Sequence, residues 1–203
     1  MIAIIDYGLG NLFSLSGSLA HLGIASTVTR DPAEIGAAER VILPGVGAFG
    51  DAMEKLKTQA LIPVIDQQVQ AGKPLLGICL GMQLLFERGY EYGEHTGLGY
   101  LGGGIYPLTP DIPKTLKVPH IGWNSLRYVK PDDPFLTNIR EGDYVYYVHS
   151  FYAKGCEDSL IAGSEYGVFV PGIVHRGNVY GTQFHPEKSG NVGLALLKTF
   201  CEV

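Results

Sequence analysis

Cys79 is the residue whose surroundings most clearly suggest chemistry. It lies in Gly77-Ile78-Cys79-Leu80-Gly81, where an apolar run ends in a thiol with glycine two residues away on each side. This pattern is typical of a nucleophile elbow, a strained strand-to-helix turn that lifts a side chain out of a sheet. The start of the following helix favours a thiolate there. The alternative is that Cys79 is a small buried hydrophobic residue, which is the commonest fate of a free cysteine.

A thiolate nucleophile needs a base that takes and returns protons, and the base needs a group that orients it. Among the six histidines, His185 closes the apolar run 180–184 and is followed by Pro186 and Glu187. The proline stiffens the backbone, so the histidine and the glutamate can lie on one side of a loop with the carboxylate on one imidazole nitrogen. Taken alone, His-Pro-Glu is usually an ordinary turn, and only the elbow cysteine makes a catalytic site the better hypothesis.

A glycine-rich loop, residues 44–50, directly follows the expected strand 41–43. Its sequence, Pro-Gly-Val-Gly-Ala-Phe-Gly, leaves backbone N–H groups free to point at a ligand, which is what an oxyanion hole requires. A phosphate cradle is the competing interpretation. It is disfavoured because the Lys-Ser/Thr of a P-loop is absent and Lys55 comes too late.

A second glycine pair, Gly8 and Gly10, could belong to a dinucleotide fold, with Asp31 at about the right distance for a ribose. The fingerprint fails at its third glycine position, which is Phe13. We therefore expect no cofactor.

Positioning these groups requires a sheet, and the first part of the chain predicts one. Fully apolar runs separated by helical stretches are typical of a parallel sheet covered on both faces. Asp31, Pro32 and Glu34 supply an N-cap, a first-turn proline and a capping-box acid for one of the helices. The expected strands are 2–5, 25–29, 41–43 and 75–79, and the other expected helices are 12–22, 51–59, 62–71 and the helical run 82–86.

The second half changes character, because residues 102–186 are rich in Tyr, Val, Pro and Gly with little helical periodicity. Segments 121–129, 144–153, 160–166 and 179–184 predict antiparallel strands or a β-lobe, and 190–202 returns to helical spacing with Val192, Leu196 and Phe200 on one face. The predicted fold is α/β, a doubly wound, flavodoxin-like, mostly parallel sheet flanked by helices, in a single domain of residues 1–203.

Composition limits the kinds of partner that the chain can bind. Fifteen Lys plus Arg against twenty Asp plus Glu give a net charge of -5, which argues against binding to nucleic acid.

The three cysteines are widely spaced, which argues against a disulfide framework and against a zinc site. We therefore expect no metal and a cytoplasmic location, and we interpret Cys156 and Cys201 as structural residues. The apolar start reaches Asp6 without a basic leader, and the longest apolar stretch, 75–86, is too short for a membrane span of roughly 20 residues.

The motifs together resemble the class I glutamine amidotransferases, whose signatures are a Gly-x-Cys-x-Gly elbow and a downstream His-Pro-Glu. Within that class the similarity is greatest to the glutaminase subunits of imidazole glycerol phosphate synthases, which supply ammonia in histidine biosynthesis. The segments that carry the resemblance extend over nearly the whole chain: residues 6–11, 44–50, 77–86, 120–124, 147–151 and 181–188.

The resemblance implies roles for the site residues. Cys79 would attack the side-chain amide of L-glutamine, His185 would protonate the departing ammonia and later activate water, and Glu187 would orient His185. It implies an oxyanion hole made by the Leu80 N–H and an N–H of Val46 or Gly47. Glutamine would be held by Gly47, Gln83, Ser150 and Phe151; a plain helix residue is the alternative for Gln83.

The resemblance also implies a partner, a (β/α)₈ cyclase subunit that accepts the ammonia in a heterodimer. Trp123, the only tryptophan, is the main interface candidate, because aromatic residues are enriched in interface cores. Asn11 and Lys188 are weaker candidates. Two other functions stay open: a stand-alone cysteine hydrolase that cleaves γ-glutamyl bonds, and a non-catalytic binding module that does not need the triad.

Overall fold

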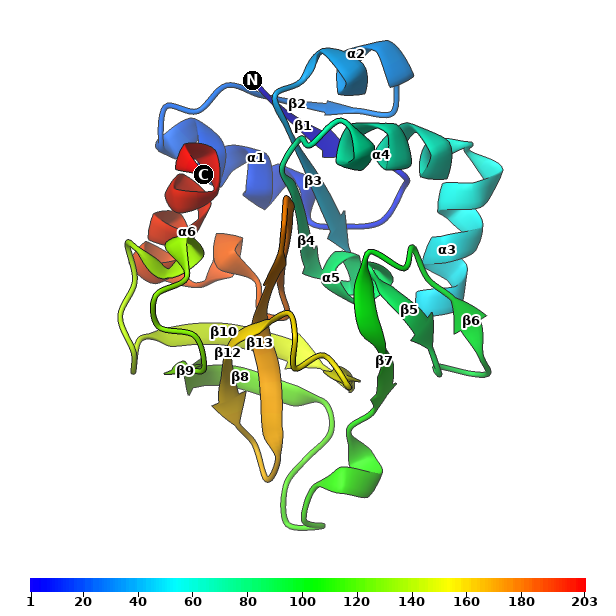
Figure 1. The fold of residues 1–203 in the computed structure, drawn as a ribbon. Coiled ribbons are helices and arrows are strands. Elements are labelled where there is room, and N and C mark those ends of the chain that lie inside the picture. Colours follow the sequence, from blue (N-terminus) through cyan, green and yellow to red (C-terminus); the bar gives the residue numbers. More distant parts are fainter.

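A computed structural model describes residues 1–203, and its main sheet has eight strands in the order β2-β1-β3-β4-β14-β13-β12-β9 (Figure 1). The strands from β2 to β14 pair in parallel, and those from β14 to β9 pair antiparallel. The strands are β1 (Ile2–Ile5), β2 (Ser26–Thr29), β3 (Arg40–Gly45), β4 (Leu75–Cys79), β9 (Arg127–Tyr128), β12 (Leu160–Glu165), β13 (Phe169–Arg176) and β14 (Val179–Thr182).

Helices cover both faces of this sheet, as the apolar strands predicted. Helices α1 (Leu12–His21) and α6 (Gly190–Glu202) lie on one face, and α2 (Pro32–Ala37), α3 (Phe49–Thr58) and α4 (Leu61–Gln70) lie on the other (Figure 1). Because side chains alternate along a strand, β1 contributes Ile2 and Ile4 to one core cluster and Ala3 and Ile5 to the other. The doubly wound α/β prediction is confirmed.

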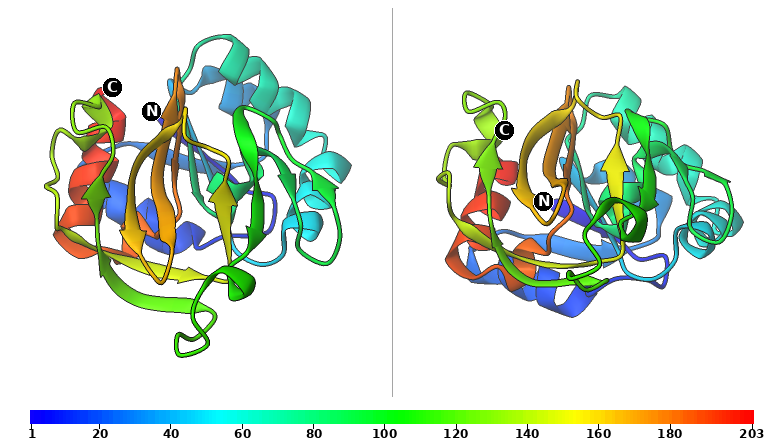
Figure 2. Two further views of the ribbon diagram at one scale, coloured as in Figure 1. Left: turned by 60° about the horizontal axis from the view of Figure 1, so that its bottom comes forward. Right: turned by 90° about the horizontal axis from the view of Figure 1, so that it is seen from below.

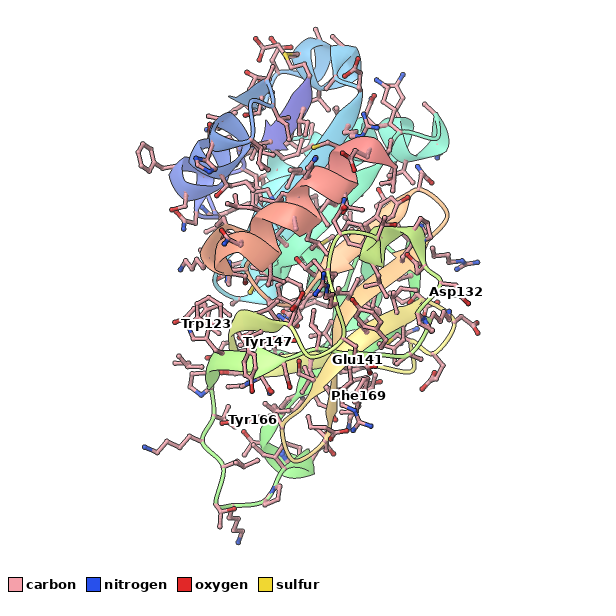
Figure 3. All side chains as sticks on the ribbon, turned by 90° about the vertical axis from the view of Figure 1, so that its left-hand side faces the viewer. Trp123, Asp132, Glu141, Tyr147, Tyr166 and Phe169 are labelled. Atoms are coloured by element: carbon pink, nitrogen blue, oxygen red, sulfur yellow. The ribbon has the colours of Figure 1, made fainter.

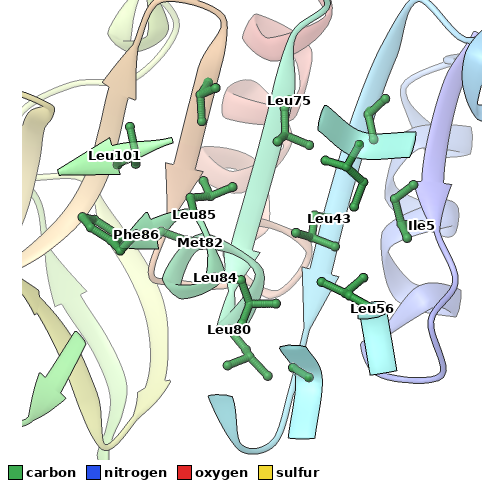
Figure 4. Close-up of a cluster of buried hydrophobic side chains, with 14 of the residues drawn as sticks. Ile5, Leu43, Leu56, Leu75, Leu80, Met82, Leu84, Leu85, Phe86 and Leu101 are labelled. Carbon is green, nitrogen blue, oxygen red and sulfur yellow. The ribbon is translucent and has the colours of Figure 1, made fainter. Parts of the chain in front are cut away.

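The elbow lies between the two cores, because Ile78 and Cys79 belong to one cluster and Leu80 belongs to the other. Leu43 of β3, Leu75 of β4 and Leu80 just after Cys79 are buried in the same cluster, with Leu56 of α3 against them (Figure 4). Fully burying a leucine side chain stabilises a fold by about 1.5 to 3 kcal/mol. The strand ends that bear the site are therefore held by close packing.

Two smaller sheets complete the fold. Strands β11 (Phe151–Lys154), β7 (Leu101–Pro107), β5 (Phe86–Gly89) and β6 (His95–Thr96) form one, and β8 (His120–Ser125) pairs with β10 (Tyr144–His149) in the other. The β8–β10 pair curves across one end of the molecule (Figure 2). Short 3₁₀ turns occupy Thr109–Asp111, Pro134–Leu136 and Pro186–Lys188. No helix combines the length and the apolar character that crossing a membrane requires.

The second half departs from the predicted β-lobe. The last strands extend the main sheet, and β14 pairs in parallel with β4, which the local sequence did not indicate. Strand β13 was not predicted at all. The predicted strand 144–153 is broken at Ser150, so β10 and β11 belong to different sheets, and 121–129 is interrupted at Leu126. Strands β14, β10 and β11 pair with partners far apart in sequence, whereas β13 pairs with its neighbours β12 and β14.

Two local predictions were also wrong. The helix after the elbow, α5 (Leu80–Leu84), is short, and Phe86 begins β5 because it pairs with Leu101. The Asp31 side chain caps α2 by accepting from the Ala33 N–H at 2.7 Å, as predicted. The Asp31 N–H, however, donates to Thr29 Oγ1 at 2.9 Å, so it is not left for Glu34 to complete a capping box.

Candidate active site

The turn at Cys79 has the strained backbone that the elbow prediction requires. Cys79 has φ +54° and ψ −110°, between the end of β4 and the first residue of α5. A Cβ on Gly81 would lie 1.8 Å from the Leu43 carbonyl oxygen, and one on Gly77 would lie 2.6 Å from the Gly81 oxygen. Positive φ is rare for residues other than glycine and clusters at functional sites, where packing maintains it. The two flanking glycines make that packing possible.

The loop after β3 has two kinds of glycine. A Cβ on Gly45 would lie 2.7 Å from the Tyr7 hydroxyl oxygen and 2.8 Å from the Gly81 nitrogen, so Gly45 is needed for close packing against the elbow. Gly47 has φ +102° and open space around it. The N–H groups of Val46 and Gly47 donate to no acceptor within the protein. Both residues therefore carry free donors beside Cys79.

His185 and Glu187 form the expected pair. His185 Nδ1 lies 2.9 Å from Glu187 Oε1, and both side chains are 3% exposed. Strand β14 ends at Thr182, so His185 does not close the strand as predicted. Its position is fixed instead by the backbone: the His185 N–H donates to Tyr146 O, and the Ser189 hydroxyl donates to His185 O. Because a carboxylate can only accept, His185 Nδ1 carries a proton.

The protonation of His185 depends on its two neighbours. Burial disfavours the imidazolium, but hydrogen bonding and charge attraction from Cys79 and Glu187 outweigh it and raise the pKa of His185 to about 10. The arrangement therefore favours an imidazolium beside the sulfur. Such a group can give a proton to a departing amine and later take one from water.

These groups meet in a cavity of about 300 Å³, at the lower end of the volumes typical of small-molecule sites. All residues predicted for the oxyanion hole and for glutamine binding line it together with Cys79 and His185. The lining is Val46, Gly47, Cys79, Leu80, Gln83, Glu91, Pro119, Val148, His149, Ser150, Phe151 and His185.

The three predicted interface residues do not line this cavity. Trp123 lies on β8 at the edge of the molecule and is 55% exposed (Figure 3). Lys188 is exposed at the end of the turn that follows His185, and Asn11 borders a small gap behind Glu187. All three remain candidates for contact with another chain.

The sequence prediction missed Glu91. Its Oε2 accepts the Phe49 N–H at 2.8 Å, so the carboxylate lies at the first residue of helix α3 and faces the cavity. In the sequence Glu91 stands between tyrosines in a polar stretch, and nothing in that pattern indicates a site. A carboxylate that faces a small cavity is suited to bind an ammonium group.

His149 was also missed as a cavity residue. Its Nε2 lies 3.0 Å from His120 Nδ1, and its Nδ1 lies 2.9 Å from Phe151 O. Burial is the main cause that lowers the pKa of His149 to about 3 and that of His120 to about 4. Both rings are therefore neutral near pH 7.

Comparison with known proteins decides the family. The family model described as "Glutamine amidotransferase class-I" matches residues 3–202. The chain belongs to the class I glutamine amidotransferases. This confirms the predicted enzyme class and the resemblance on which it depended.

Relatives of this amidotransferase carry a more specific name. It is 49% identical over 204 residues to "Imidazole glycerol phosphate synthase subunit HisH" of Caldanaerobacter subterraneus subsp. tengcongensis, which covers 100% of this chain and 98% of the relative. The protein of the same name from Bacillus cereus (strain G9842) is 51% identical over 201 residues, covering 98% of this chain and 93% of the relative.

Solved structures agree on the fold. "Crystal structure of glutamine amidotransferase" superposes with a TM-score of 0.77 at 18% identity, covering 100% of this chain and 98% of the other. "Structure of PurLQS from Thermotoga maritima" has a TM-score of 0.75 at 20% identity, covering 99% and 97%. At these identities the likeness establishes the shared architecture.

Proposed function

We propose that this amidotransferase is the glutaminase subunit of an imidazole glycerol phosphate synthase, acting as one domain of residues 1–203. It hydrolyses glutamine to glutamate and ammonia and passes the ammonia to a cyclase subunit in histidine biosynthesis. The observation that carries the proposal is the cavity where the strained Cys79 elbow meets the His185–Glu187 pair. Relatives at about 50% identity over nearly the whole chain, named as subunits of that synthase, support it.

The chemistry follows from this arrangement. The Cys79 thiolate attacks the side-chain amide carbon of glutamine, and the charge that develops on oxygen is stabilised by the Leu80 N–H together with Val46 or Gly47. His185 gives its proton to the departing nitrogen, so ammonia leaves and a thioester remains. Water, deprotonated by His185, then attacks the thioester, which releases glutamate and restores the thiolate beside the His185 imidazolium. Each oxyanion donor is worth about 3 to 4 kcal/mol of barrier.

The rest of the cavity suits the amino-acid end of glutamine. The Glu91 carboxylate pairs with the α-ammonium group, and the backbone at Ser150 and Phe151 holds the α-carboxylate. Gln83 binds the substrate from the helix that follows the nucleophile, and Gly47 contacts it from the oxyanion loop. These roles give every polar group of glutamine a partner, which a small-molecule site needs for specificity.

The partner is a cyclase subunit with a (β/α)₈ barrel, joined to this chain as a heterodimer in the cytoplasm. Its contact surface includes Trp123, Lys188 and Asn11, which come from three separate elements or their ends. Partner and acceptor binding select the state in which a peptide of residues 45–47 points its N–H into the oxyanion hole. Glutaminase turnover then rises by a population shift. The open space around Gly47 permits such a flip.

Ammonia release from glutamine, measured for the purified chain with and without the cyclase subunit, tests the proposal. We expect turnover to rise with the cyclase. Equal turnover in both would contradict partner control and favour a stand-alone hydrolase, and no turnover in either would favour a binding module. Cys79→Ala should abolish glutamine-dependent synthesis, whereas free ammonia should still support the cyclase reaction. Glutamine-dependent activity that survives this substitution would refute the nucleophile assignment.

A further inference from the structure

Gln183 is a buried polar side chain beside the nucleophile. It follows β14, is 0% exposed, and lies between Gln83 and Cys79. Gln83 Nε2 lies 3.0 Å from Gln183 Oε1, and Gln183 Nε2 lies 3.8 Å from Cys79 Sγ. Gln183 does not line the substrate cavity, so its side chain reaches the sulfur from behind.

A single backbone carbonyl fixes the direction of this chain of hydrogen bonds. Gln83 Nε2 lies 3.1 Å from Phe151 O, which can only accept, so the Gln83 amide must turn its NH₂ group toward it. The same nitrogen reaches Gln183, so Gln183 must present its oxygen there. The NH₂ group of Gln183 is then the part that faces Cys79. Reversing the Gln83 amide would set its oxygen against the Phe151 carbonyl oxygen, and reversing the Gln183 amide would set two NH₂ groups against each other.

Phe151 O is itself firmly held. His149 Nδ1 is 2.9 Å away and must be the protonated nitrogen of that ring, because the carbonyl cannot donate. The carbonyl thus accepts from both His149 and Gln83, which fills its two lone pairs. The neighbouring His120 donates to His149 Nε2, which keeps the latter ring in one tautomer.

At the sulfur, Gln183 opposes another group. Cys79 Sγ also lies 3.9 Å from Val148 O, an acceptor that favours the protonated thiol. An N–H that points at sulfur favours the thiolate instead, since a hydrogen bond to the charged form stabilises that form. We propose that Gln183 is a positioning residue for Cys79, whose side-chain N–H orients the sulfur and stabilises its thiolate.

Other titratable groups face Cys79 as well. The His185 imidazolium attracts the Cys79 thiolate, and Tyr7 lies close enough for a charge on Cys79 to help raise the pKa of its hydroxyl. His149 and Glu91 line the same cavity, and Glu187 stands behind His185. Among the groups around the sulfur, Gln183 is a neutral donor whose direction is fixed over the whole pH range. Removing the Gln183 amide should therefore shift the pH range over which Cys79 becomes reactive, and it introduces no new titrating group that could account for the shift.

The test is the pH dependence of Cys79 alkylation by iodoacetamide in the full chain, followed by mass spectrometry of the Cys79 peptide. The thiolate is the reactive species. Peptide mapping separates Cys79 from Cys156, whose burial raises its pKa to about 12, and from Cys201. Gln183→Met keeps the shape and removes the donor. We expect half-maximal alkylation to shift upward by about one pH unit, with about tenfold slower alkylation at any pH well below the wild-type midpoint.

Thr182→Val is the matched control. Thr182 is the adjacent residue, equally buried, and its hydroxyl has no hydrogen-bond partner, so its alkylation profile should match that of the wild type. Gln183→Glu covers the case in which the methionine variant does not fold. It keeps an acceptor for Gln83 but turns a carboxylate toward the sulfur, so its shift should be at least as large. Profiles of both folded variants that superpose on the wild type would overturn the proposal.

This inference depends on Cys79 being the nucleophile, but the two can fail separately. Alkylation needs neither glutamine nor the cyclase. If Cys79→Ala loses its glutamine-dependent activity as expected but the alkylation profile of Gln183→Met is not shifted, only the role of Gln183 is contradicted. A shifted profile in a chain whose Cys79→Ala variant still hydrolyses glutamine contradicts only the proposed function.

Discussion

Replacing Glu187 with glutamine should separate the charge of this residue from its shape. The introduced side-chain amide could still accept the His185 Nδ1–H through its oxygen, so the ring keeps its orientation. The contact spans 2.9 Å between side chains that are 3% exposed, and Glu187 Oε2 has no partner. One hydrogen bond to a charged group therefore carries the effect.

The size of the change follows from that single bond. A buried hydrogen bond to a charged group contributes about 1.5 to 3 kcal/mol, and about 1.36 kcal/mol corresponds to one pKa unit. We expect the pKa of His185, which Cys79 and Glu187 raise to about 10 against the effect of burial, to fall by about one to two units in Glu187→Gln. In the proposed mechanism the imidazolium is the active form, so activity should be lost at lower pH than in the wild type.

The assay is the pH profile of kcat/KM for glutamine hydrolysis in the complex with the cyclase, because that ratio reports ionisations of the free enzyme. The basic limb should move down by about one to two pH units. Asp133→Asn is the matched control, since Asp133 Oδ2 lies 2.8 Å from the Nδ1 of His175, away from the cavity. A basic limb that stays in place in Glu187→Gln would show that the carboxylate does not set the protonation of His185.

Three further predictions concern packing, partner binding and pH. Gly81→Ala places a Cβ 1.8 Å from the Leu43 oxygen, so we expect the free energy of unfolding in urea to fall by about 1 to 3 kcal/mol and glutamine-dependent activity to be largely lost. Gly36→Ala is the control, because a Cβ there has no neighbour within 4 Å and should change neither quantity. Trp123→Ala should raise the Kd for the cyclase about 30-fold, measured by calorimetry, and leave the Tm of the chain unchanged. An unchanged Kd would show that Trp123 is not part of the interface. The unfolded state protonates His149 and His120 near pH 6.5, but the folded state does so only near pH 3 and 4. The free energy of unfolding should therefore fall below pH 6.5, by about 2 kcal/mol for each of the two histidines at pH 5. A His149→Asn variant whose unfolding free energy depends on pH as strongly as that of the wild type would contradict this.

Much of the site could be predicted because its signals are local. The elbow needs glycine where a Cβ would meet neighbouring backbone, and the sequence shows Gly77 and Gly81 directly. His185 and Glu187 are two residues apart, so their contact depends on one turn. The parallel part of the sheet was also predictable, because strands buried on both faces must be apolar throughout.

The sequence by itself determined the nucleophile motif, the His-Pro-Glu motif and the doubly wound half of the fold. Only the tertiary structure decided that β14 joins β4, that residues 144–153 divide between two sheets, and that Glu91 and Gln183 lie at the site. These features depend on contacts between residues far apart in the chain. Gln183 and Cys79 are 104 positions apart, and neighbouring sequence cannot encode which buried amide meets the sulfur. Packing of the sheet brings them together, and the Phe151 carbonyl then fixes which atom of Gln183 faces Cys79.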